Sequence, residues 1–318
     1  MIMEYSIVFV SLLVILMTYF KVANYFNIVD KPNERSAHKE ITLRGGGVVF
    51  WFASLLYLVQ NSYSKSSFFV GITIVSGVSF WDDIKSLPNK VRIIAQLLAM
   101  SIIFYFVHVY EFFPLYGVVL VYVFAVGIIN AYNFLDGING ITGLYSVVVL
   151  GSLLFVNECL VNFVDNNFIV YPIIACIVFL IFNFRKRAKC FAGDVGSIAV
   201  AFWVIYLILV LIIETKSYVW LLFLVVYGVD SVCTILHRLC LRQNIFLAHR
   251  LHFYQVLCND YGLDHRLVAF LYAVIQLGMS AVVIFFFRRV NDFYLFLLLI
   301  IPLVLLYNVK FYLINKKG

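Results

Sequence analysis

Asp194 is the first residue that suggests chemistry in this chain. It stands between two glycines in the segment CFAGDVGS (190–197), and long apolar runs lie on both sides of that segment. Four basic residues precede it closely. An Asp at this place can cap the following helix, but Ser197 could do so equally well. We therefore expect a carboxylate with room beside it for a metal ion and a phosphate.

A second acidic motif is the adjacent pair Asp82-Asp83, at the end of another apolar run. Two neighbouring carboxylates repel each other, so they favour a cation or a shared proton. Mg²⁺, which prefers oxygen ligands, would satisfy them. A solvated helix cap is the alternative interpretation.

A third motif is NAYNFLDGING (130–140), in which Asn130, Asn133 and Asp136 recur at intervals of three. On a helix these residues share one face. A polar stripe within an apolar stretch is costly in lipid unless it has a partner. The following glycines would let the backbone approach a ligand.

Basic residues and histidines gather in two further segments, 30–47 and 230–255. Arginine cannot ligate a metal, so two histidines with an arginine suit a phosphate or a sugar better than a metal ion. A solvated loop, or a basic loop near anionic lipid headgroups, is the alternative. The candidates are Arg35, His38 and Arg44 in the first segment, and His249, Arg250 and His252 in the second.

The elements that must position these residues are membrane helices. Of the 318 residues, 64% are hydrophobic and 12% are charged, against about 25% charged in soluble domains. A spanning helix needs about 20 apolar residues. We expect an all-α polytopic membrane protein with a single domain over residues 1–318 and 10–11 transmembrane helices. The eleven candidate spans are about 5–20, 45–60, 66–81, 93–109, 115–130, 140–156, 168–184, 198–213, 218–236, 267–287 and 293–311.

The distribution of charge predicts the orientation. One side of the eleven-span arrangement carries 19 of the 23 Lys and Arg residues, which is typical of cytoplasmic loops. All the motifs above fall on that side. A channel or transporter would more often place ionisable groups at mid-membrane. No arginine-rich tract with interleaved aromatics suggests nucleic acid, and the scattered cysteines suggest neither a disulfide nor a zinc site.

The ordered motifs, from about Asp30 to Gln255, resemble those of the polyprenyl-phosphate N-acetylhexosamine-1-phosphate transferases. They are D-x-P-x-x-R-x-x-H…R-G-G, D-D, N-x-x-N-F-x-D-G, G-D-x-G-S and a histidine loop. The family includes the phospho-MurNAc-pentapeptide translocase and the enzymes that initiate O-antigen. The loop H-R-L-H-F-Y-Q is closer to the O-antigen initiators, because the translocase has three consecutive histidines. Leu43 stands where the family often has proline.

This resemblance implies a reaction at the cytoplasmic face of the bacterial inner membrane. Undecaprenyl phosphate attacks the β-phosphorus of a UDP-N-acetylhexosamine, UMP leaves, and Mg²⁺ (or Mn²⁺) is required. The product would start O-antigen or another cell-surface polysaccharide. Direct attack is our preferred mechanism, although an adjacent Asp pair also suits an aspartyl-phosphate intermediate. A homodimer is compatible with the sequence, which does not determine the oligomeric state.

The resemblance also implies roles for individual residues. Asp194 and Asn133 would hold the metal. Asp82, Asp83 and Asp136 would be catalytic. The substrate-binding set is Arg92, which follows the Asp pair, together with Asn130, His249, Arg250, His252, Arg35, His38 and Arg44.

Three rival functions predict different properties. A CDP-alcohol phosphotransferase would carry D-G-x-x-A-R, whereas Asp136-Gly137 is not followed by Ala-Arg. A transporter of a phosphorylated or nucleotide-linked solute predicts flux, and a lipid-phosphate-binding protein predicts no turnover. UMP release separates all three from the expected transferase.

Overall fold

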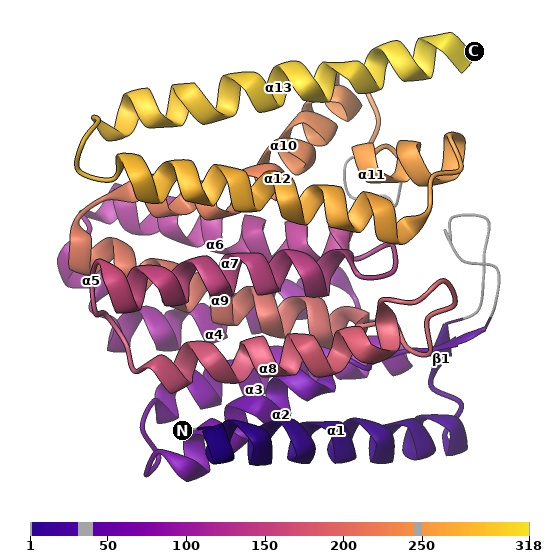
Figure 1. Cartoon of the computed structure of the whole chain (residues 1–318), viewed down its shortest axis with the longest axis vertical. Helices are drawn as coiled ribbons and strands as arrows, with labels where there is room; N and C mark the ends of the chain where they lie inside the picture. Colours follow the sequence, from indigo (N-terminus) through magenta and orange to yellow (C-terminus); the bar gives the residue numbers. More distant parts are fainter. Residues whose placement is uncertain (1, 31–40, 245–249, 318) are drawn as a thin grey trace.

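Long helices make up most of the chain, as expected where lipid offers the backbone no hydrogen-bond partners. The computed structural model describes residues 2–30, 41–244 and 250–317, in which the helices run side by side (Figure 1). The helices are α1 (Ile2–Tyr25), α2 (Val48–Gln60), α3 (Ser66–Ile84), α4 (Asn89–Phe106), α5 (Val109–Phe112), α6 (Leu115–Leu135), α7 (Ile141–Cys159), α8 (Asn166–Asn183), α9 (Gly193–Thr215), η1 (Tyr218–Leu224), α10 (Val225–Cys240), α11 (Phe253–Gln255), η2 (Val256–Asp260), α12 (His265–Phe286) and α13 (Asp292–Lys317).

The prediction of an all-α polytopic membrane protein is confirmed. Within the described residues, ten helical segments are long and apolar enough to cross a membrane. The second of the eleven expected spans is shorter than predicted, because α2 has only 13 residues. At 1.5 Å per residue it extends about 20 Å, less than the roughly 30 Å of a bilayer core. Helix α1 begins at one end of the bundle and α13 ends at the other (Figure 1).

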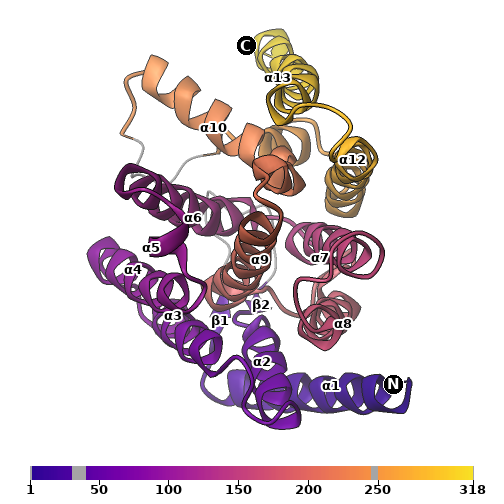
Figure 2. The same ribbon diagram turned by 90° about the vertical axis from the view of Figure 1, so that its left-hand side faces the viewer.

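Helix α9 lies at the centre of the bundle (Figure 2). Every residue from 195 to 209 is buried, and a helix that is apolar all round belongs inside a bundle. Helices α2, α3, α6 and α7 all pack against it. The first turn of α9, which contains Asp194, is therefore fixed by neighbours on several sides.

A short pairing of strands attaches the first loop to the start of α9. Strands β1 (Val29–Asp30) and β2 (Thr42–Leu43) are antiparallel, and Leu43 also pairs with Cys190. The Gly47 N–H then donates to the carbonyl of Ala192 at 3.0 Å. A Cβ on Gly47 would lie 2.0 Å from Gly196 Cα. The glycines of the two motifs therefore allow the two backbones to touch.

The span expected at 218–236 is broken between η1 and α10. The side chain of Gln276, from α12, accepts from the Val226 N–H at 3.2 Å and donates to the Leu222 carbonyl at 3.1 Å. It thus satisfies backbone groups on both sides of the break. Beyond the break α10 leaves the bundle axis at an angle (Figure 2).

Candidate active site

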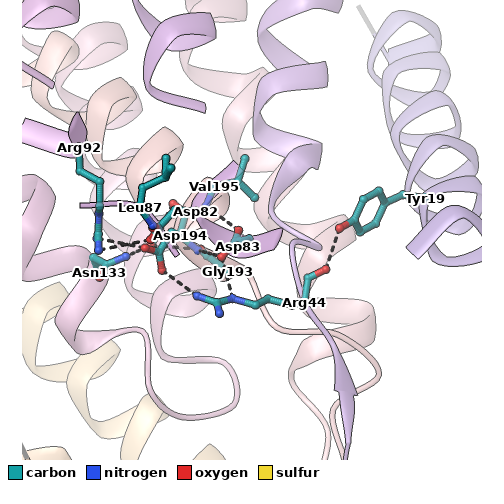
Figure 3. A network of polar contacts seen from close by, with 11 residues as sticks. Tyr19, Arg44, Asp82, Asp83, Leu87, Arg92, Asn133, Gly193, Asp194 and Val195 are labelled. Atoms are coloured by element: carbon teal, nitrogen blue, oxygen red, sulfur yellow. Dashed lines mark hydrogen bonds and ion pairs between the residues drawn. The ribbon is translucent and has the colours of Figure 1, made fainter. Parts of the chain in front are cut away.

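Three carboxylates and two guanidinium groups meet at one end of the bundle (Figure 3). Asp82 and Asp83 end α3, Asp194 lies in the first turn of α9, and Arg92 lies in the first turn of α4. Arg44 follows β2, and its carbonyl accepts a 2.7 Å hydrogen bond from the Tyr19 hydroxyl of α1. The structure therefore brings together five residues that the sequence singled out.

Asp194 lies between the two arginines. Its Oδ1 is 3.3 Å from Arg44 Nη2, and its Oδ2 is 3.0 Å from Arg92 Nη2. Its side chain does not cap α9, because the helix begins at Gly193 and Asp194 already lies inside its first turn. Ser197 does not cap the helix either, because its hydroxyl donates to the Gly193 carbonyl at 3.2 Å. The Asp194 carboxylate is therefore directed into the charged cluster.

Asp83 caps α9 from outside that helix. Its carboxylate accepts the N–H groups of Asp194 at 2.9 Å and of Val195 at 3.1 Å. It also lies 2.7 Å from Arg44 Nε, and its side chain is 0% exposed. A carboxylate at a helix N-terminus satisfies free N–H groups and the positive end of the dipole. Asp83 thus fixes the position of Asp194.

The glycines beside Asp194 serve this packing, which corrects the expectation that they leave room for a metal and a phosphate. Gly193 has φ +71°, and a Cβ there would lie 2.4 Å from Asp83 Oδ2. A Cβ on Gly196 would lie 2.6 Å from Gly47 Cα. The space that the absent side chains create is filled by the protein itself.

Asp82 has a different environment from its neighbour. Its Oδ1 accepts the Leu87 N–H at 2.5 Å, and its Oδ2 lies 3.3 Å from Arg92 Nη1. Arg92 therefore contacts both Asp82 and Asp194. Across the described part of the chain, no three His, Cys, Asp or Glu side chains gather closely enough to enclose a metal ion. Mg²⁺, however, is commonly held by one or two carboxylates together with waters and substrate phosphates. Asp82 and Asp194 offer oxygen donors of that kind.

The third motif is only partly brought together. Asn133 faces α9 and donates to the Ser197 hydroxyl at 3.3 Å. Asn130 donates at 2.8 Å to the Val126 carbonyl of its own helix. Asp136 is the C-cap of α6 and follows its last residue, Leu135, one position beyond the helix that carries Asn130 and Asn133.

Asp136 is partly buried, and its Oδ1 accepts a 2.6 Å hydrogen bond from the Thr142 hydroxyl. Burial raises the pKa of Asp136 to about 7, and the hydrogen bond from Thr142 opposes part of that shift. The carboxyl group is therefore partly protonated near neutral pH.

Comparison with known proteins concerns the part of the chain that contains most of this cluster. Residues 66–212 match the family described as glycosyl transferase family 4. Over this stretch, just under half of its length, the chain is similar to that family. The matched residues contain four members of the charged cluster: Asp82, Asp83, Arg92 and Asp194.

Several named proteins are similar to this chain. A Bacillus subtilis (strain 168) protein, "Probable undecaprenyl-phosphate N-acetylglucosaminyl 1-phosphate transferase", is 24% identical over 306 residues, covering 88% of this chain and 84% of that protein. An Escherichia coli O157:H7 protein, "Undecaprenyl-phosphate alpha-N-acetylglucosaminyl 1-phosphate transferase", is 28% identical over 59% of this chain and 56% of its own length. A "Phospho-N-acetylmuramoyl-pentapeptide-transferase" from Streptococcus agalactiae serotype III is 31% identical over 48% and 55%. The chain spans little more than half of the last two relatives.

The predicted basic residues fall into two groups. Arg44 and Arg92 lie in the cluster. Arg35, His38 and His249 lie outside the described residues. Arg250 is exposed, whereas His252 is 2% exposed and its Nδ1 lies 3.2 Å from Asp230 Oδ1. The structure does not place His252 among the clustered carboxylates.

The sequence reasoning missed Asn183, which connects two motif loops. Its Oδ1 accepts the Gly140 N–H at 2.6 Å, and its Nδ2 donates to the Cys190 carbonyl at 2.9 Å. It therefore holds the loop after Asp136 against the segment before Asp194. The sequence signal that could have identified Asn183 is a single amide side chain at the end of an apolar run.

Proposed function

We propose that this protein transfers N-acetylhexosamine 1-phosphate from a UDP-linked sugar to undecaprenyl phosphate, with release of UMP. The observation that carries the proposal is the gathering of Asp82 and Asp194 around Arg92, with Arg44 on the other side of Asp194. Phosphoryl transfer depends mainly on positioning and on electrostatic stabilisation. The names of the relatives from Bacillus subtilis and Escherichia coli support the same class of substrates.

In this reaction an oxygen of the lipid phosphate attacks the β-phosphorus of the sugar nucleotide. The bond from that phosphorus to the bridging oxygen breaks, and UMP leaves with the bond's electron pair. Arg44 and Arg92 lie where they could neutralise phosphate oxygens. Asp82, which accepts one backbone N–H where Asp83 accepts two, is the better candidate to orient or deprotonate the lipid phosphate.

Asp82 and Asp194 fit a Mg²⁺ ion shared with the substrate, with Asn133 nearby on α6. Such an ion would supply positive charge where negative charge develops on the phosphoryl group. We place the reaction on the cytoplasmic side of the inner membrane, because most basic residues lie at that end. The product would begin O-antigen or another cell-surface polysaccharide.

The test is UMP release by the purified protein with undecaprenyl phosphate, Mg²⁺ and a panel of UDP-N-acetylhexosamines, including UDP-GlcNAc and 6-deoxy sugars. We expect release with at least one sugar, and none from Asp194→Asn. Equal release by that variant at the same Mg²⁺ concentration would contradict the role of Asp194. Absence of release by folded wild-type protein with every sugar would reject the proposed reaction for those substrates.

A further inference from the structure

Asp230 is a buried carboxylate that lies outside the charged cluster, near the start of α10. It is 3% exposed and receives hydrogen bonds from two elements other than its own helix. Its Oδ1 accepts from His252 Nδ1 at 3.2 Å and from the Phe253 N–H at 3.1 Å, both in the loop before η2. Its Oδ2 accepts from the Tyr272 hydroxyl of α12 at 2.7 Å. A buried carboxylate needs such partners, because leaving it unpaired is strongly unfavourable.

The same loop is attached to the end of α6. The Tyr254 hydroxyl donates to the Phe134 carbonyl at 3.0 Å. Gly137 allows this contact, because a Cβ there would lie 2.1 Å from the Tyr254 hydroxyl oxygen. Phe134 and Gly137 flank Asp136, so the loop lies directly beside the third motif.

The turn itself is closed within the loop. The Gln255 side chain accepts the His252 N–H at 3.2 Å, which satisfies a free donor at the start of α11. His252 is thus fixed through its ring by Asp230 and through its backbone by Gln255. Arg250, two residues earlier, is exposed.

We propose that Asp230 is a positioning residue, which holds the loop from Arg250 to Gln255 against α6 so that Arg250 can bind a phosphate of the sugar nucleotide. His252 then acts as the loop's buried anchor. This inference rests on the proposed transferase function. Arginine suits the bound group, because its guanidinium forms paired hydrogen bonds with phosphate oxygens.

The kinetic test compares Asp230→Asn, Arg250→Ala and the double variant of the full-length protein in the UMP-release assay. We expect each single change to raise KM for the UDP-sugar about tenfold, or about 1.4 kcal/mol, with kcat and KM for the lipid within about twofold of wild type. KM for the UDP-sugar in the double variant should be no higher than in Arg250→Ala, because both changes remove the same interaction with the sugar nucleotide. A loss confined to kcat, or multiplied effects in the double variant, would overturn the proposal.

Ser231→Ala is the matched control. Ser231 is the neighbour of Asp230, is 7% exposed, and its hydroxyl has no hydrogen-bond partner among the described residues. Its removal should leave KM unchanged. If Asp230→Asn does not purify as a folded protein, His252→Gln removes the same contact from the loop side and should give the same rise in KM.

A second readout does not depend on the reaction. Hydrogen exchange of the Phe253 amide, followed by mass spectrometry, should be slow in the wild type and at least about tenfold faster in Asp230→Ala. Unchanged exchange would reject the anchoring, even if UMP is released. Faster exchange in Asp230→Ala, combined with no UMP release by the wild type, would support the anchoring by Asp230 and reject the transferase function.

Discussion

Asp82 and Asp83 allow the same substitution to be made at two neighbouring carboxylates with different contacts. In Asp83→Asn an NH₂ group replaces one carboxylate oxygen. Oδ1 of Asp83 serves Arg44 and the Asp194 N–H, and Oδ2 serves the Val195 N–H. Whichever way the amide is turned, its NH₂ faces a donor, so at least one hydrogen bond is lost.

The size of the effect follows from these contacts. Loss of a hydrogen bond to a charged group costs about 1.5–3 kcal/mol, and an unsatisfied buried donor adds about 1–3 kcal/mol. Arg44 is 31% exposed, so water can compensate part of its loss. We therefore expect Asp83→Asn to lower the stability of the protein by about 3 kcal/mol, and to lower activity because Asp194 is no longer held.

Asp82→Asn should behave in the opposite way. One amide oxygen can still accept the Leu87 N–H. The NH₂ group gives up the 3.3 Å contact with Arg92, but Arg92 is 22% exposed and still contacts Asp194, so this loss is small. The change also removes one negative charge from the cluster. We expect a change in stability of less than about 1 kcal/mol, together with a loss of at least about a hundredfold in UMP release.

The assay is thermal unfolding in detergent by circular dichroism at 222 nm, with UMP release measured on the same preparations. A drop in Tm of several degrees for Asp83→Asn alone, with activity lost in both variants, would support the assignment. Equal drops in Tm would show that Asp82 is also structural. An unchanged Tm with lost activity in Asp83→Asn would refute the capping role and make Asp83 the catalytic candidate.

Three further predictions concern packing, pH and metal. Gly196→Ala should lower Tm and activity, because the new Cβ forces α9 away from the first loop. Gly151→Ala is the control: no atom lies within 4 Å of the new Cβ, so the change should be neutral or slightly stabilising. Thermal unfolding compares the two variants. Because burial raises the Asp136 pKa to about 7, its neutral form stabilises the folded state fully below about pH 4, and this contribution is lost as the pH rises to about 7. Tm measured in EDTA should therefore fall between pH 5 and 8 more in the wild type than in Asp136→Asn, and parallel curves would contradict this. EDTA should stop UMP release and excess Mg²⁺ should restore it, and turnover that persists in EDTA would exclude the metal requirement.

The sequence predicted where the site lies better than how it is built. Asp82, Asp194 and Arg92 each stand at the end of an apolar run, and helix ends on one side of a membrane must lie at a similar depth. Their convergence could therefore be expected from topology. The short length of α2 could not be expected in this way, because its apolar stretch continues into the glycines of the first loop.

Long-range contacts explain most of what the sequence did not reveal. Asp83 and the Asp194 N–H are 111 positions apart, and only packing of α3 against α9 shows that one caps the other. A glycine beside a carboxylate suggests space for a ligand, whereas Gly193 in fact accommodates Asp83. His252 raised a similar ambiguity, because a histidine in a basic loop reads as a ligand contact until its buried partner is known.

The charge balance of the cluster gives a physical reason for a divalent cation. Asp82, Asp83 and Asp194 carry three negative charges when ionised, and Arg44 and Arg92 carry two positive ones, so the cluster keeps one negative charge. The diphosphate of a sugar nucleotide and a lipid phosphate add at least three more. Two like charges 4 Å apart repel by about 4 kcal/mol at an effective dielectric constant of about 20, so the two substrates would not assemble here unaided. A cation held by Asp82 and Asp194 would reverse the sign of the cluster, and Arg92, which now contacts both of these carboxylates, could then bind a phosphate.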